Sequence, residues 1–359
     1  MYMQASLILE NGEVITGESF GYEWNTSGEV VFNTGMTWYP ETLTDPSYKS
    51  QILVCSYPLL WNYGVPDFDQ EDDFWLKKYF ESDSVHISAL IVSEYSENYN
   101  HHEWESSLSA FLKLHKVPAI TGVDTRYLTQ KLRDNGCMLW KIQIWNTKNT
   151  LPFHDPNTDL LSYEVCCQEI TRYANGKKKI CLVDMGVKNN IIRNLLNYDV
   201  EIIRVPWDHT FMDDGETYDG IFLSNGPGDP SLYTKTIDQV SKALKKNIPM
   251  FGICLWNQLL ALAAWAKTYK LPYGHRGQNQ PCKNTITWKC IVTSQNHSFA
   301  IDEATLPSTI KPLFKNINDG SNEWIYFTKK SARSVQFHPE SSPGPHDSKY
   351  LFEDFISSL

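Results

Sequence analysis

The alternation of apolar and polar residues changes character partway along the chain. In residues 1–145, short apolar, β-prone runs are separated by polar loops, and helix-prone stretches follow at 103–115 and 125–134. The turn-forming pair Asn11-Gly12 joins two of the runs, and Asp124-Thr125 can cap the second helix. This pattern predicts an N-terminal unit of mixed α/β structure.

From residue 179 onward, apolar strand-like runs alternate with helix-like runs. The strand-like runs are 179–186, 200–206, 218–230 (ending in a glycine loop) and 248–253, and the helix-like runs are 188–198, 236–246 and 255–266. Such alternation predicts an α/β fold with a mostly parallel sheet covered by helices on both faces, here over residues 179–359. Residues 146–178 are polar and turn-rich, which indicates an interdomain connection, although 160–170 within it can form an ordered strand or helix.

The junction at Cys254 is the most informative point of the second unit. A β-prone run ends there, and a helix-prone run begins at the next residue. A side chain at such a corner is held on a tight turn, as in serine elbows, and lies over a helix N-terminus that favours thiolate. Cys254 is therefore a candidate nucleophile, which needs a base, a group that orients the base, and donors for an oxyanion.

Other segments offer those groups. His338 and Glu340 are two residues apart in a strand-like segment, so both side chains face one way and the carboxylate can orient the imidazole. The loop 226–229 follows a buried strand and can aim N–H groups into a cleft, and 293–299 carries amides that can contact a polar substrate. Taken singly, these motifs fit a surface strand end, a plain turn and an internally bonded loop. The nearby elbow cysteine favours the catalytic interpretation.

Composition narrows the class of protein. The 359 residues are 42% hydrophobic and 21% charged, which is a globular composition long enough for two domains. The net charge of −10 argues against a nucleic-acid partner. The apolar stretch 259–266 is too short to span a membrane, and residues 1–17 lack the features of a signal peptide. The eight cysteines form neither a disulfide framework nor a zinc pattern, so we expect a reducing, cytoplasmic environment and no metal.

Taken in order, the GPGDP loop, the elbow around Cys254 and the final His-Pro-Glu resemble the signature of the class I glutamine amidotransferases. The resemblance covers residues 179–359. It implies that Cys254 attacks the amide carbon of glutamine to form a thioester, and that His338, oriented by Glu340, passes the proton to departing ammonia. It also implies that the amides of Gly228 and Leu255 hold the oxyanion, and that water then releases glutamate.

The N-terminal unit narrows the resemblance. Segments similar to the small subunit of carbamoyl-phosphate synthetase occur at 35–51, 62–66, 121–136, 274–281 and 341–348. This similarity implies a glutamine site lined by Ser47, Gly226, Gly228, Leu255, Gln258, Asn296, Ser298 and Phe299. It further implies that ammonia passes through an interior tunnel to a large subunit, which makes carbamoyl phosphate for arginine and pyrimidine biosynthesis. No cofactor is expected in this chain. ATP, bicarbonate and metal ions are expected on the large subunit, which fits the lack of a phosphate loop here.

The sequence departs from the family pattern in a systematic way. Tryptophan stands where the family has glycine at Trp38, Trp61, Trp140, Trp256, Trp265, Trp288 and Trp324. Trp256 matters most, because a glycine two residues after the nucleophile permits close packing and unusual backbone angles. Ser298 and Asn257 are milder departures, from glycine and histidine.

Three functions are compatible with these features. The first is a working glutaminase subunit of carbamoyl-phosphate synthetase, supported by the intact Cys254, His338 and Glu340. The second is a catalytically weak chain that mainly binds and holds the large subunit, because Trp256 disturbs the elbow. The third is a glutaminase for a guanine-nucleotide or anthranilate synthase, which the N-terminal unit disfavours.

Overall fold

The structure, a computed structural model, describes residues 3–37, 39–58, 63–100, 104–145 and 151–359, so Trp38 and Trp61 lie outside the described residues. By their internal contacts the residues form two compact units, Met1–Thr158 and Asp159–Leu359. Residues 159–178, which we expected in the connection, belong to the second unit. They contain α4 (Ser162–Val165) and β10 (Thr171–Tyr173), which pairs with a strand of the second unit's sheet.

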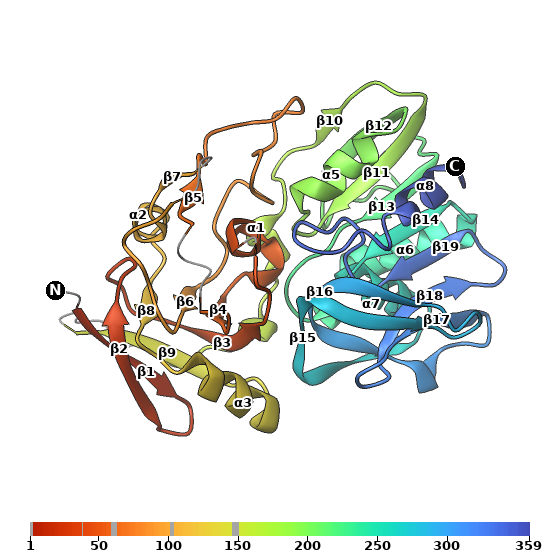
Figure 1. The fold of residues 1–359 in the computed structure, drawn as a ribbon. Helices are drawn as coiled ribbons and strands as arrows, with labels where there is room; N and C mark the ends of the chain where they lie inside the picture. Colours follow the sequence, from red (N-terminus) through yellow and green to blue (C-terminus); the bar gives the residue numbers. More distant parts are fainter. Residues whose placement is uncertain (1–2, 38, 59–62, 101–103, 146–150) are drawn as a thin grey trace. The chain divides into compact units, whose positions relative to one another are not determined.

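The first unit is built on a closed barrel, drawn in red to yellow in Figure 1. In barrel order the strands are β1 (Met3–Leu9), β2 (Val14–Ser19), β8 (Ala119–Thr121), β6 (Ala89–Ile91), β4 (Gln51–Cys55), β3 (Thr26–Asn33) and β9 (Leu139–Ile144). The Asn11-Gly12 turn joins β1 and β2 as predicted, with Gly12 at φ 87°. The predicted mixed α/β structure is therefore present, whereas closure of the barrel depends on long-range pairing of β3 with β9.

Short helices and one two-stranded sheet complete this unit. They are α1 (Tyr39–Thr44), α2 (Leu108–Leu114), α3 (Thr125–Asn135), the 3₁₀ turns Pro46–Tyr48 and Pro156–Thr158, and the pair β5 (Val65–Pro66) and β7 (Trp104–Ser106). Asp124 caps α3, as predicted, by accepting a hydrogen bond from the Tyr127 amide. The helix expected over 103–115 was partly wrong. Residues 104–106 form β7, and α2 begins only after Ser107, whose hydroxyl accepts from the Ala110 amide.

The second unit contains a ten-stranded sheet, green to blue in Figure 1. The strand order is β10, β12 (Val200–Pro206), β11 (Lys178–Asp184), β13 (Gly220–Leu223), β14 (Met250–Ile253), β19 (Ala332–Val335), β18 (Asn322–Phe327), β17 (Ile310–Asn316), β15 (Lys267–Asn284) and β16 (Cys290–Asp302). The strands from β12 to β19 are parallel, as expected from the strand–helix alternation. Beyond β19 the sheet continues as an antiparallel ribbon, which the sequence did not predict.

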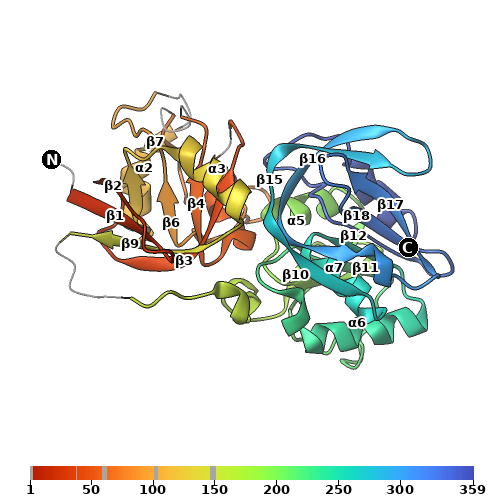
Figure 2. The same ribbon diagram turned by 90° about the horizontal axis from the view of Figure 1, so that it is seen from below.

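Successive residues of a strand point to opposite faces of the sheet, so apolar residues on both faces need to be covered. Helices cover both faces of the parallel strands. Phe222 and Phe251 pack against Phe352 and Phe355 of α8 (Tyr350–Ile356) on one face. On the other face the apolar cluster includes residues of α6 (Thr234–Lys246) and α7 (Leu255–Ala263), which lie side by side in Figure 2. The remaining helix is α5 (Asn189–Leu196), and 3₁₀ turns occur at Pro230–Leu232 and Glu303–Thr305. None of the helices in the described residues is long and apolar enough to cross a membrane.

The five described tryptophans at family glycine positions fall into two groups. Trp140, Trp256 and Trp324 are buried, and the indole N–H of each has no hydrogen-bond partner among the described residues. Trp265 and Trp288 are exposed, with φ of 69° and 63°. The left-handed region is strained for a bulky side chain and unstrained for glycine. Each of the five sites thus carries a feature that suits a smaller residue.

Trp265 occupies the C-terminal cap of α7. The Trp265 amide donates to the Leu262 carbonyl and the Ala266 amide to the Ala261 carbonyl, at 2.9 and 3.0 Å. This is the Schellman arrangement, whose left-handed residue is usually glycine. The indole is 93% exposed, so it needs no space among the neighbouring alanines.

We expect Trp265→Gly to raise the free energy of unfolding of the second unit by about 1 kcal/mol, because it relieves the strained backbone without removing buried contacts. Denaturant unfolding of the parent and variant chains measures the change. Trp24→Gly is the control, since Trp24 is also exposed but its φ is not positive. A midpoint for Trp265→Gly at or below that of the parent contradicts the prediction.

Candidate active site

Cys254 forms a strained corner between β14 and α7. Its φ and ψ are 58° and −106°, a conformation that costs a non-glycine residue roughly 1–3 kcal/mol. The Cys254 amide donates to the Val335 carbonyl of β19 at 2.8 Å, and the Asn257 amide closes the first helical turn onto the Cys254 carbonyl. These bonds hold the corner in the elbow geometry expected from the sequence.

His338 and Glu340 lie just beyond the end of β19. Their contact joins His338 Nδ1 to Glu340 Oε1 at 2.6 Å, and both side chains are buried. The strand ends earlier than we expected, at Val335, so residues 336–340 follow a bend and turn rather than extended chain. The His338 amide donates to the Ser294 carbonyl of β16, which fixes the segment after β19 against the ribbon.

Lys188, which sequence reasoning missed, completes a buried row of charges. Its Nζ lies 3.0 Å from Glu340 Oε1 and donates to the Ser341 carbonyl at 2.7 Å. It stands at the N-terminus of α5, just past the end of β11. A lysine at the end of the short loop that follows a buried parallel strand is the signal that could have revealed it, because ligand sites in such sheets lie at those strand ends.

The buried charges set the protonation of the pair. Burial alone would lower the pKa of His338, but Glu340 and the Cys254 sulfur raise it to about 10. Burial would raise the pKa of Glu340, but Lys188 and His338 lower it to about 2. At neutral pH the ring is therefore protonated and the carboxylate ionised. The second ring nitrogen, Nε2, is buried and has no hydrogen-bond partner among the described residues.

Four of the predicted glutamine-site residues lie close to the sulfur or to one another. The Asn296 carbonyl is 3.5 Å from Cys254 Sγ, and Gln258 Nε2 donates to the Phe299 carbonyl at 2.8 Å. Ser298, between them on β16, has a hydroxyl that accepts from buried Arg276 at 2.5 Å. The structure thus gathers Gln258, Asn296, Ser298 and Phe299 where β16 meets α7.

The glycine loop approaches the same helix terminus. A Cβ added to Gly226 would lie 2.9 Å from the Leu255 side chain, so glycine allows the loop to contact the first turn of α7. Gly228 has φ 86°, which glycine adopts without strain. The amides of Gly228 and Leu255 remain the predicted oxyanion donors. Ser47 lies in the 3₁₀ turn Pro46–Tyr48 of the first unit, and its place in the glutamine site remains a prediction.

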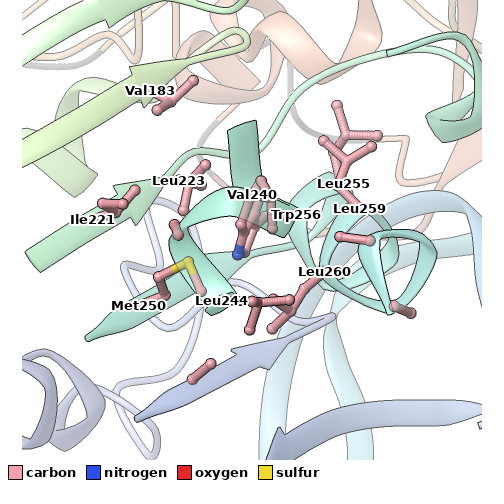
Figure 3. Close-up of a cluster of buried hydrophobic side chains, with 14 of the residues drawn as sticks. Val183, Ile221, Leu223, Val240, Leu244, Met250, Leu255, Trp256, Leu259 and Leu260 are labelled. Atoms are coloured by element: carbon pink, nitrogen blue, oxygen red, sulfur yellow. The ribbon is translucent and has the colours of Figure 1, made fainter. Parts of the chain in front are cut away.

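Trp256 points into the apolar cluster beneath the elbow. Figure 3 shows the indole near Val240, with Leu223 and Leu255 nearby, and no part of the residue is exposed. A Cβ added to Gly252 of β14 would overlap the indole ring, so a glycine on the strand provides its space. The ring is therefore accommodated between strand and helix, with its N–H unpaired.

A second buried polar cluster lies beside the site. His275, His297 and Glu323 offer atoms within 4.8 Å of one another, a spacing that could suit a metal ion. Each of the three residues already has a protein partner, although Glu323 Oε2 has none among the described residues. Asn316 Nδ2 donates to Glu323 at 3.2 Å and faces His275 Nδ1 at 3.3 Å, and Nε2 of His297 faces Gln295 at 3.3 Å. The cluster is thus a hydrogen-bonded network, and the expected lack of a metal stays a prediction.

Comparisons with known proteins match both units. The carbamoyl-phosphate synthase small chain, CPSase domain, matches residues 7–142, and glutamine amidotransferase class-I matches residues 181–358. "Multifunctional protein ura1" of Schizosaccharomyces pombe is 46% identical over 99% of this chain and 17% of its own length. "Multifunctional protein CAD" of Squalus acanthias is 49% identical over 98% of this chain and 16% of its own length. The human "Carbamoyl-phosphate synthase [ammonia], mitochondrial" is 45% identical over 99% of this chain. The chain spans 24% of the length of that human relative. It therefore matches less than a quarter of the length of each of the three relatives.

We expect iodoacetamide at pH 7 to label Cys254 faster than the other seven cysteines, because a protonated His338 stabilises a thiolate there. Burial raises the pKa of five of the others, Cys55, Cys166, Cys167, Cys181 and Cys282. The exposed Cys290 is the strictest comparison within the chain. Time-resolved peptide mass spectrometry measures each rate, and Cys254→Ser should remove the fast phase. Equal labelling of Cys254 and Cys290 would count against an activated thiolate.

Proposed function

Because the chain belongs to the carbamoyl-phosphate synthase small-chain family and carries a class I glutamine amidotransferase domain, we propose that it hydrolyses L-glutamine and supplies the ammonia to a synthetase partner. One observation carries the proposal. Cys254 stands at a strained elbow beside the buried imidazole of His338, which is hydrogen-bonded to the carboxylate of Glu340. This is the arrangement that nucleophilic acyl transfer by a thiol requires.

The proposed reaction assigns one task to each group. Cys254 Sγ forms a bond to the amide carbon of glutamine, and the proton on His338 passes to the departing nitrogen as the C–N bond breaks and ammonia leaves. Water then attacks the thioester, gives a proton to His338 and releases glutamate, while Glu340 keeps the ring oriented. The amides of Gly228 and Leu255 are the proposed oxyanion donors. The other proposed glutamine contacts are Ser47, Gly226, Gln258, Asn296, Ser298 and Phe299.

The partner is proposed from the relatives. The chain matches 16–24% of the length of the three named above, which leaves room in each for other parts. We assign the use of ATP, bicarbonate and metal ions to a large synthetase subunit that makes carbamoyl phosphate, for the arginine or pyrimidine pathways. The proposed location is cytoplasmic, although one relative is named mitochondrial.

A second candidate function has specific support. The chain could bind and hold the synthetase with little glutaminase activity, because the Trp256 indole packs against Gly252 in the apolar cluster beneath the nucleophile. One relative carries the word ammonia in its name. Against this candidate stands the intact buried contact between His338 and Glu340.

Glutamate release from glutamine, with and without an added large subunit, tests the first proposal. We expect release above background that rises when the large subunit is present. Cys254→Ser should abolish glutamine-dependent but not ammonia-dependent carbamoyl phosphate synthesis, since ammonia bypasses the thioester. Release at background in both conditions favours the second candidate. Loss of both syntheses in the variant would mean that the substitution damages assembly.

The second candidate predicts that Trp256→Gly restores glutaminase activity. A nucleophile displaced by about 1 Å can lose on the order of 100-fold in rate, so kcat should rise by roughly that factor if the indole displaces Cys254. Steady-state glutaminase assays of the two chains give kcat. Trp324→Gly is the control, since Trp324 is also buried but stacks on Phe314 in the ribbon. An unchanged kcat for Trp256→Gly shows that the elbow tolerates the ring.

A further inference from the structure

The sulfur of Cys254 contacts a side chain that the proposed function does not use. Gln336 follows β19, is fully buried, and places Nε2 at 3.8 Å from Cys254 Sγ. Its backbone amide donates to the Glu323 carbonyl at 2.9 Å, which fixes the residue beside the ribbon. An amide side chain has two donors on nitrogen and one acceptor oxygen, so which end faces the sulfur decides its effect.

The surrounding hydrogen bonds determine that orientation. The Phe299 carbonyl can only accept, so the Gln258 atom at 2.8 Å from it must be the NH₂ nitrogen. The same nitrogen lies 3.0 Å from Gln336 and must meet an acceptor there, which places Oε1 on that side. Asn257 Nδ2 donates to the same oxygen at 3.4 Å, while Asn257 Oδ1 accepts from Ser334. The Gln336 nitrogen is therefore left to face the sulfur.

The two polar neighbours of the sulfur favour opposite protonation states. The Asn296 carbonyl accepts the proton of a thiol, and its lone pairs oppose a negative sulfur. The Gln336 N–H stabilises a negative sulfur, and this effect is strengthened because the site is buried. The protonated His338 stabilises the negative sulfur by its charge. Gln336 adds a hydrogen-bond donor whose position is already fixed and need not change when the sulfur becomes negative.

We propose that Gln336 is a catalytic residue that donates a hydrogen bond to Cys254 Sγ whenever that sulfur carries negative charge. The proposal rests on the glutaminase function proposed above. It applies to the resting thiolate and to thioester hydrolysis. In that second step water attacks the carbonyl carbon, the C–S bond breaks, and its electron pair returns to sulfur opposite the Gln336 N–H. The proton lost by water goes to His338.

A purely structural role would act through Gln258. In that case Gln336 would only hold the Gln258 amide in place, and its loss would raise KM for glutamine without changing the reactivity of the thiol. The two roles are therefore separable by measuring the thiol directly, without glutamine.

The experiment follows alkylation of Cys254 by iodoacetamide from pH 5 to 9 in the full chain. Gln336→Met removes the donor and keeps the length of the side chain. We expect the rate at pH 7 to fall roughly tenfold or more, and the pH of half-maximal rate to move upward, because a hydrogen bond to a charged group is lost. In the glutaminase assay kcat should fall by a similar factor.

Two further variants keep the result interpretable. Gln336→Glu retains an oxygen toward Gln258 and Asn257 but places an oxygen against the sulfur, so at pH 8 it should slow alkylation at least as much. Ser334→Ala removes a hydroxyl from the same buried network without reaching the sulfur, and its alkylation profile should stay within about twofold of the parent. An unchanged alkylation profile in the folded Met and Glu variants overturns the proposal. Failure of the parent chain to release glutamate would contradict the proposed glutaminase function. It would leave the alkylation result for Gln336 unaffected, because alkylation needs no glutamine.

Discussion

The parallel pairing of β14 with β19 is the constraint on which the rest of the site depends. The register runs from Met250 opposite Ala332 to Ile253 opposite Val335, and the Cys254 amide extends the ladder by one bond. Parallel strands end at the same edge of a sheet, so residues that follow the two strands meet although Cys254 and Gln336 are 82 positions apart. β11 and β13 continue the same edge, which adds Lys188 and the glycine loop. The segments that follow these four neighbouring strands thus together form the site.

This arrangement concentrates backbone strain and buried charge, both of which oppose folding, in a small volume. Cys254 holds a positive φ, and Lys188, His338 and Glu340 are buried almost completely. Buried charges of this kind are stable only as a mutually satisfied set, and removal of one member typically costs about 3–5 kcal/mol. The hydrophobic core formed by the sheet with α6 and α7 lies directly beneath the elbow and holds it in this conformation. The elements that support the site are therefore also the core of the unit.

Local signals were enough to predict much of this site. The switch from apolar run to helix at Cys254, the spacing of His338 and Glu340, and the glycine loop could all be read from the sequence, as could the parallel strands. Contacts made by distant segments could not. Lys188 and Gln336 look like ordinary residues near strand ends until the register brings them to Glu340 and the sulfur. Closure of the barrel and the antiparallel ribbon also depend on pairing partners far along the chain. The helix over 103–115 was overestimated because Ser107 begins α2 late.

Gly252 and Trp256 are linked by the overlap that any side chain on the strand would make with the indole. Their tolerance to change is therefore epistatic. A lineage holding tryptophan at position 256 cannot accept even alanine at 252, whereas one with a small residue at 256 is released from that restriction. From the present pair, position 256 must become smaller before position 252 can gain a side chain, and a deep mutational scan would find position 252 intolerant for a reason that lies on the next element, α7.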